Sequence, residues 1–161
     1  MEIPNGITIS VEGNKVKAKG PKGEVEKVFD APGVSVKLNG NVLDVTAPNR
    51  ALKGTFEAHV RNMCYGVEHG YTKKMKMIYA HFPFTLEVKG STLNIKNLLG
   101  EKLPRTSKII GKTKIEAKGQ EVTISGPDKD AVGQTIANFK RALRIKEKDC
   151  RVFQDGIYEI V

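Results

Sequence analysis

The sequence predicts an α+β fold made of two tandem, duplicated domains, each an antiparallel sheet with one helix packed on a face. Short stretches of alternating apolar and polar residues are separated by turns, and two longer stretches carry apolar residues at helical spacing. The same order of strands, turns and helix then occurs a second time along the chain. We place the first repeat at residues 1–79 and the second at residues 80–161.

Two β-hairpins are predicted in the first repeat, because alternating stretches flank turns of glycine and asparagine. The first joins residues 7–11 to 16–19, and the second joins 34–38 to 42–45 around Asn39-Gly40-Asn41. Between them, Gly20-Pro21-Lys22-Gly23 reverses the chain before a further strand that begins at Val25. A Gly-x-x-Gly loop of the KH type would lie between helices, whereas strands flank this one, so we predict a tight turn.

Each repeat is predicted to close with an amphipathic helix. The first helix follows Pro48-Asn49, ends near Gly70 and buries a stripe made of Leu52, Phe56, Val60, Met63 and Val67. The second helix begins at Asp128, whose carboxylate can cap the first turn. Its apolar residues recur at steps of four, three and four, and they are Val132, Ile136, Phe139 and Leu143. Beyond this helix we expect a basic arm.

The repeat is recognised at positions where backbone geometry restricts the residue type. A shift of 77 places residues 7–13 over 84–90 and Gly23 over Gly100. A shift of 79 places Pro48 over Pro127. The segment between the repeats, residues 73–82, alternates methionine and tyrosine with lysine, so it is predicted to be a strand.

The charge of the chain favours a large anionic partner. Its 27 Lys and Arg against 18 Asp and Glu give a net charge of +9 and a pI of about 9.5. Residues 96–114 carry six cations and one acid, whereas residues 19–36, the matching part of the first repeat, carry three of each. We expect 96–114 to be a long glycine-punctuated loop, and loops of this length are uncommon in compact domains unless they are functional.

This loop and the basic arm are the predicted RNA-binding segments, because phosphates relieve the repulsion between clustered cations. Gly100, which has no side chain, would let the backbone of the loop approach RNA closely. The candidate RNA-binding residues are Lys96, Gly100, Lys102, Arg105, Lys108, Lys112, Lys114, Lys140, Arg141, Arg144, Lys146, Lys148 and Arg151. Aromatic residues make up only 6% of the chain and none lies within the loop, which favours shape recognition of folded RNA over base stacking.

Other function classes lack support in the sequence. His59 and Cys64 are five residues apart on the first helix, which is not a spacing that brings side chains together, and His81 has no nearby partner for a metal site. Cys64 and Cys150 are expected to be reduced thiols. With no nucleophile–base set, no nucleotide-binding motif and no apolar membrane span, we expect no enzyme activity, no cofactor, no metal, no small-molecule substrate and no membrane association.

Four motifs resemble the ribosomal protein L6 family of the large subunit, in its archaeal and eukaryotic form. They are Gly20-Pro21-Lys22-Gly23-Glu24, Tyr79-Ala80-His81-Phe82-Pro83, Ile95-Lys96-Asn97-Leu98-Leu99-Gly100-Glu101-Lys102 and Val152-Phe153-Gln154-Asp155-Gly156-Ile157-Tyr158. The resemblance covers essentially the full length. Bacterial members end in a tail rich in proline, glycine and lysine, from which residues 145–158 differ, so the contacts of that tail are not transferred here.

The resemblance implies a structural protein of the large ribosomal subunit in the cytoplasm. It would bind folded ribosomal RNA near the factor-binding region, at the sarcin–ricin loop and the stalk base, mostly through the second repeat. Neighbouring ribosomal proteins and translation factors are the further partners that it implies. The alternative left open is a free-standing RNA-binding module outside the ribosome, and a protein–protein scaffold is a weaker one.

Overall fold

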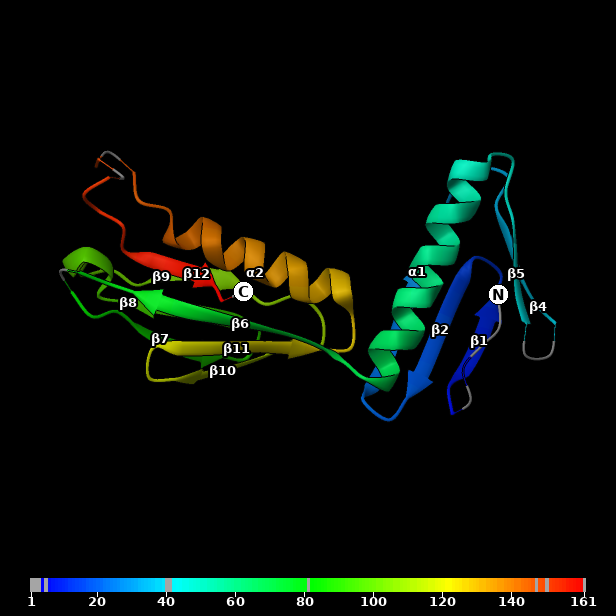
Figure 1. The fold of residues 1–161 in the computed structure, drawn as a ribbon, viewed down its shortest axis with the longest axis horizontal. Helices are drawn as coiled ribbons and strands as arrows, with labels where there is room; N and C mark the ends of the chain where they lie inside the picture. Colours follow the sequence, from blue (N-terminus) through cyan, green and yellow to red (C-terminus); the bar gives the residue numbers. More distant parts are fainter. Residues whose placement is uncertain are drawn as a thin grey trace. The chain divides into compact units, whose positions relative to one another are not determined.

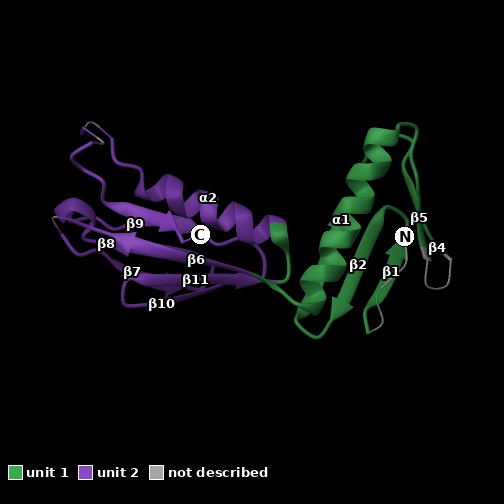
Figure 2. Cartoon of the chain, in the orientation of Figure 1, with its two compact units in different colours: residues 1–71, 127–129 green, residues 72–126, 130–161 purple. Residues whose placement is uncertain are grey.

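The computed structural model describes residues 4, 6–39, 42–80, 82–146, 148–149 and 151–160, and these form an α+β fold with antiparallel sheets (Figure 1). The chain divides into two compact units (Figure 2). Unit 1 consists of residues 1–71 and 127–129, and unit 2 consists of residues 72–126 and 130–161. The predicted fold class is therefore confirmed. The turn residues Gly40 and Asn41, together with His81 and Cys150, lie outside the described residues.

Unit 1 packs a helix against two antiparallel sheets. The strands of the first sheet are β1 (Thr8–Glu12), β2 (Lys15–Gly20) and β3 (Gly23–Val28), and those of the second are β4 (Ser35–Asn39) and β5 (Val42–Thr46). The helix is α1 (Arg50–Glu68). Alternate strand residues such as Val16, Ala18 and Val45 are fully buried against it, as the apolar–polar alternation predicts. Both predicted hairpins are confirmed, although each unit contains two sheets rather than one.

Local chemistry fixes both ends of α1. The side chain of Asn49 accepts a hydrogen bond of 3.1 Å from the backbone N–H of Ala51, so Asn49 is the N-cap. At the other end, Gly70 adopts φ +79° and its N–H donates to the carbonyl of Gly66, a conformation that favours glycine. Of the predicted buried stripe, Val60, Met63 and Val67 are buried, and Leu52 and Phe56 are partly buried.

The Gly20–Gly23 segment is the predicted tight turn. Gly20 lies opposite Gly23 where β2 and β3 pair, and the N–H of Lys22 donates to the carbonyl of Val67 at 2.9 Å. A Cβ atom on Gly20 would lie only 2.7 Å from that same carbonyl oxygen. Glycine is required here because the end of α1 approaches the strand so closely.

Unit 2 repeats this plan with additional strands. One sheet consists of β7 (Thr85–Lys89), β8 (Thr92–Lys96) and β9 (Arg105–Lys108). The other consists, in spatial order, of β10 (Lys114–Lys118), β11 (Glu121–Gly126), β6 (Tyr71–Ile78) and β12 (Gly156–Glu159). The helix is α2 (Lys129–Leu143), and a short 3₁₀ helix, η1 (Leu98–Gly100), precedes β9. The four apolar residues predicted for the buried face of α2 are all buried.

Two predictions about unit 2 need correction. Residues 96–114 are not one long loop, because they contain η1 and β9, and β9 pairs with β8. The basic arm is followed by a strand, β12, which pairs with β6. The apolar–polar alternation did not predict either strand, because each is only four residues long. Both strands are stabilised mainly by pairing with a neighbouring strand. The strand predicted at residues 73–82 is present as β6, but it covers residues 71–78 and belongs to the four-stranded sheet of unit 2.

The structural repeat follows the shifts found in the sequence. Strands β1 and β7 start at residues 8 and 85, a shift of 77, and helices α1 and α2 start at 50 and 129, a shift of 79. Gly13 and Gly90, at the matching hairpin turns, have φ of +61° and +58°. The units diverge between the second and third strands, where a two-residue turn in unit 1 is replaced by residues 97–104 in unit 2.

The close approach at Gly20 gives a test of the fold of unit 1. We expect Gly20→Ala to lower the free energy of unfolding by about 1–3 kcal/mol, because the new methyl group would meet the backbone of Val67. Gly54→Ala is the control, since nothing lies within 4 Å of its Cβ position within α1. That variant should be more stable by up to about 1 kcal/mol. Urea unfolding measures both, and destabilisation of similar size in the two variants would contradict the steric explanation.

Candidate nucleic-acid interface

The two predicted RNA-binding segments lie side by side on unit 2, because β9 runs along α2. The side chain of Asn138 in α2 donates to the carbonyl of Lys108 at 3.2 Å, and the N–H of Ile110 donates to the hydroxyl of Thr135 at 3.0 Å. A shallow groove of about 240 Å³ lies between them, lined by Thr106, Ser107, Lys108, Asn138, Arg141 and Ala142. Lys108 of β9 and Arg141 of α2 therefore share one surface.

Arg105 joins β9 to the end of α2. Its guanidinium donates from Nη1 to the carbonyls of Ala142 and Arg144 at 3.0 and 2.9 Å. Ala142 lies in the last turn of α2 and Arg144 follows the helix directly, so no intrahelical N–H is available to either carbonyl. The same guanidinium makes a two-point contact with the Glu101 carboxylate, at 2.8 Å from Nε and 2.5 Å from Nη2.

This double contact limits what Arg105 can offer to RNA. Hydrogen bonds from Arg105 lower the pKa of Glu101, and Glu101 raises the pKa of Arg105, so both groups stay charged near neutral pH. Most of the guanidinium donors are already used within the protein. We therefore expect Arg105, an RNA-binding candidate from the sequence, to act by positioning α2 against β9.

Four other candidates also have partners within the protein. Lys96 Nζ lies 2.8 Å from Glu87, Lys140 Nζ lies 2.6 Å from Glu159, and the Arg151 guanidinium lies 3.1 Å from Asp149. These cations lower the pKa of each of the three carboxylates. Lys148 Nζ lies 4.6 Å from the centroid of the Phe153 ring. Because the ion pairs are at the surface, they contribute little to stability and can be exchanged for phosphate contacts.

The remaining cations of the candidate set extend into solvent. Six of them are exposed and make no ion pair with any other described residue: Lys102, Lys108, Lys114, Arg141, Arg144 and Lys146. Lys112 is also exposed. Lys108 and Arg141 line the groove between β9 and α2, so they are the strongest candidates for contacts with phosphates.

Gly100 has a conformational role that the sequence did not reveal. It ends η1 with φ +78°, and the preceding residues Asn97 and Leu99 also have positive φ, of 62° and 49°. Positive φ is strained for a leucine. The Asn97 side chain donates to the carbonyl of Pro83, which holds this segment in place. Gly100 is thus required for the turn that leads into β9.

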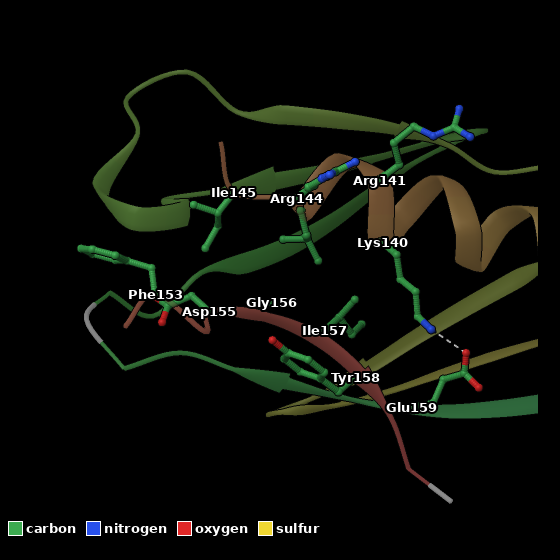
Figure 3. Close-up of a pocket in the computed structure, with 11 residues that line it drawn as sticks. Lys140, Arg141, Arg144, Ile145, Phe153, Asp155, Gly156, Ile157, Tyr158 and Glu159 are labelled. Atoms are coloured by element: carbon green, nitrogen blue, oxygen red, sulfur yellow. Dashed lines mark hydrogen bonds and ion pairs between the residues drawn. The ribbon is translucent and has the colours of Figure 1, made fainter. Parts of the chain in front are cut away.

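A second groove, of about 700 Å³, lies between the end of α2 and β12 (Figure 3). Leu143 and Ile157 are buried in its walls, while Lys140, Arg144 and Phe153 also line it. This groove could not be predicted from the sequence, because it depends on the pairing of β12 with β6. The alternation of Gly156-Ile157-Tyr158-Glu159 was the available signal for that strand.

The described residues offer little for catalysis or metal binding. They include no group of three or more His, Cys, Asp or Glu side chains placed to hold a metal ion. Cys64 is buried, and burial raises the pKa of its thiol, which keeps it protonated. His59 lies beside the ring of Phe29. Among the described helices, none has the length and apolar character needed to span a bilayer.

Comparison with known proteins gives a consistent result over nearly the whole chain. The family model described as Ribosomal protein L6 matches residues 3–70 and again residues 82–156, one match for each repeat. Large ribosomal subunit protein uL6 from Methanosarcina mazei is 44% identical over 98% of this chain and 93% of its own length. The proteins of the same name from Methanobrevibacter smithii and Aeropyrum pernix are 45% and 43% identical, over 99% and 98% of this chain and 93% and 90% of their own lengths.

The contacts of Arg105 predict a loss of stability when it is removed. We expect Arg105→Ala to lower the free energy of unfolding by about 1–3 kcal/mol, because two carbonyls and a carboxylate lose charged donors. Lys108→Ala, on the same strand but exposed, should change it by less than about 0.5 kcal/mol. Equal effects of the two substitutions in thermal unfolding would contradict the positioning role.

The lowered pKa of Glu101 predicts a dependence on pH. A carboxylate whose pKa is lowered by folding adds stability at pH values above its ordinary pKa, here 4.5, and this stability is lost as the pH falls through the lowered value. The stability difference between the native chain and Glu101→Gln should therefore be largest near neutral pH and should shrink in acid. Urea unfolding across this pH range measures it, and a constant difference would argue against the ion pair.

Proposed function

Because the chain belongs to the ribosomal protein L6 family, we propose that it binds folded ribosomal RNA of the large subunit through the cationic surface shared by β9 and α2. It is a structural, non-enzymatic component of the large ribosomal subunit, and its place is in the cytoplasm with that subunit. The observation that carries the proposal is the adjacency of Lys108 and Arg141, from two segments far apart in sequence, along one groove.

Electrostatics accounts for the affinity in this proposal. Exposed cations that lack an acidic partner displace counterions from phosphates, and each phosphate contact adds to the affinity without reading a base. The groove between β9 and α2 is shallow and has no aromatic side chain among the described residues that line it. It is therefore suited to the backbone and the 2′-hydroxyl groups of folded RNA, where shape is recognised rather than sequence.

The finer location comes from the family resemblance. We place the surface near the factor-binding region, against the sarcin–ricin loop and the stalk base. The milder charge of the first repeat leaves unit 1 available for neighbouring ribosomal proteins or translation factors.

The salt dependence of binding tests the electrostatic surface. A triple variant, Lys108→Ala, Arg141→Ala and Arg144→Ala, should bind fragments of large-subunit RNA more weakly than the native chain. The slope of log affinity against log salt should fall by about 2–3, at roughly 0.7–0.9 for each phosphate that the variant no longer neutralises.

The matched control removes one lysine and two arginines from exposed positions of unit 1, in the variant Lys37→Ala, Arg50→Ala and Arg61→Ala. Filter binding across a series of salt concentrations measures both variants. An equal fall in slope for the two would show that total charge, rather than the surface of β9 and α2, determines binding. A flat salt response of the native chain would contradict the proposal itself.

Ultraviolet crosslinking within assembled large subunits tests the location. Mass spectrometry of the crosslinked peptides should find contacts in residues 102–114 and 140–146, with the partner nucleotides in the sarcin–ricin loop and the stalk base. Crosslinks from these residues to a distant RNA domain would refute the placement. Sedimentation of cell lysate on sucrose gradients distinguishes the alternative of a free-standing RNA-binding module, which would remain in the light fractions.

A further inference from the structure

Unit 2 has a second exposed surface, the outer side of the four-stranded sheet. One face of this sheet is covered by α2 (Figure 1). Met75 and Met77 of β6 and Ile157 of β12 are buried, so we infer that their side chains face α2. Because strand residues alternate, the residues between them point away from α2. Those on β6 and β12 are Lys74, Lys76, Ile78 and Tyr158, and all four are exposed.

Tyr158 is the aromatic residue of this outer face. Because β12 is the edge strand of the sheet, the groove between α2 and β12 also reaches Tyr158 (Figure 3). It lies directly opposite Lys76 in the pairing of β12 with β6. Its hydroxyl donates to the carbonyl of Gln154 at 2.9 Å, and its ring passes 3.7 Å from the position where Gly156 would carry a Cβ. The ring is thus fixed along the strand, with no side chain on the neighbouring outward position, and 47% of the residue remains exposed.

Lysines surround this ring on the outer face. The buried residues Val122 and Ile124 of β11 pair with Ala117 and Ile115 of β10, so the other residues of β10 point outward with Lys76. The outward cations of the sheet are Lys74, Lys76, Lys114 and Lys118, and the outward acids are Glu116 and Glu121. Within the described part of the chain, none of these lysines forms an ion pair.

The opposite side of the sheet differs in this respect. There Glu159 neutralises two cations, with Lys140 at 2.6 Å and Lys73 at 3.7 Å. The outer face therefore combines a fixed aromatic ring with lysines that keep their charge for a partner. Single-stranded nucleic acid matches this combination, because a base stacks on the ring while phosphates lie against the lysines. A continuous duplex does not match it, since its base faces are covered by neighbouring bases.

We propose that the outer face of β6 and β12 is a second RNA-binding surface, which holds an unpaired stretch of RNA with one base stacked on Tyr158 and its phosphates at Lys74 and Lys76. This inference rests on the proposed RNA-binding function and extends it to another face and another form of RNA. Unit 2 then contacts folded RNA at the surface of β9 and α2 and an unpaired strand on the outer side of the sheet.

The sequence contains no tryptophan, which allows a direct test of stacking. The full-length variant Tyr158→Trp is titrated with single-stranded oligoadenylate of about ten nucleotides and with a blunt RNA duplex of the same length. We expect the single strand to quench the tryptophan fluorescence and the duplex to leave it unchanged. Absence of quenching while the single strand binds, or equal quenching by the duplex, would overturn the proposal.

Affinity measurements separate stacking from a general loss of structure. By fluorescence anisotropy of labelled oligoadenylate, Tyr158→Ala should bind about 5- to 150-fold more weakly, the range measured for loss of one base–aromatic stack. Tyr158→Phe keeps the ring and should bind within about threefold of the native chain. Tyr158→Leu and a thermal unfolding measurement on each variant show whether β12 is retained. A loss in Tyr158→Phe as large as in Tyr158→Ala would rule out stacking.

Variants of the lysines distinguish this surface from the one proposed above. Lys74→Ala with Lys76→Ala should weaken oligoadenylate binding. Lys102→Ala with Lys108→Ala, which lie outside the groove that includes Tyr158, should leave it unchanged and weaken binding of folded ribosomal RNA. If the second pair abolishes both, there is only one RNA surface and the present inference is wrong while the proposed function stands. If no variant on either face changes binding of any RNA, the proposed function fails as well.

Discussion

The contact of Arg105 with the end of α2 determines how unit 2 presents its charge. Its guanidinium joins β9 to the carbonyls of Ala142 and Arg144 and is itself oriented by the Glu101 carboxylate. A helix end without such a donor would leave these carbonyls to water and would be free to separate from the sheet. Because Arg105 holds the helix end against β9, Lys108 and Arg141 line the same groove. The repulsion between these two cations therefore persists in the folded state, and an anionic ligand relieves it.

The two units share one plan and differ in the segment that supports this surface. Both units use the same turns and the same helix position, and glycines with positive φ stand at matching hairpin turns. In unit 1 the second and third strands are joined by a two-residue turn, whose N–H contacts the end of α1 at Val67. In unit 2 residues 97–104 replace that turn and supply Glu101, which orients Arg105 against the helix end. The longer connection of unit 2 therefore supports the charged surface of β9 and α2.

The cations of unit 2 fall into groups with different roles. Arg105 is used for positioning, and Lys96, Lys140 and Arg151 are balanced by carboxylates at the surface. Lys108 and Arg141 have no such partner among the described residues and line the groove between β9 and α2, and Lys74 and Lys76 lie on the outer side of the sheet that carries Tyr158. Net charge alone therefore says little about where an anion binds, since the geometry of the neighbouring acids decides which cations remain available.

The sequence by itself determined the fold class, the duplication, both helices with the buried face of α2 and the hairpins of unit 1, because periodicity, caps and turn residues act over short distances in the chain. It also indicated which stretches of the second repeat are basic. It could not distinguish Arg105 from Arg141, because the roles of these residues depend on carbonyls and carboxylates brought together only by folding. Nor could it place Tyr158 beside Lys76, since β12 gains its order from pairing with β6. Tertiary structure decided these features because strand pairing and helix docking join residues that are far apart in the chain.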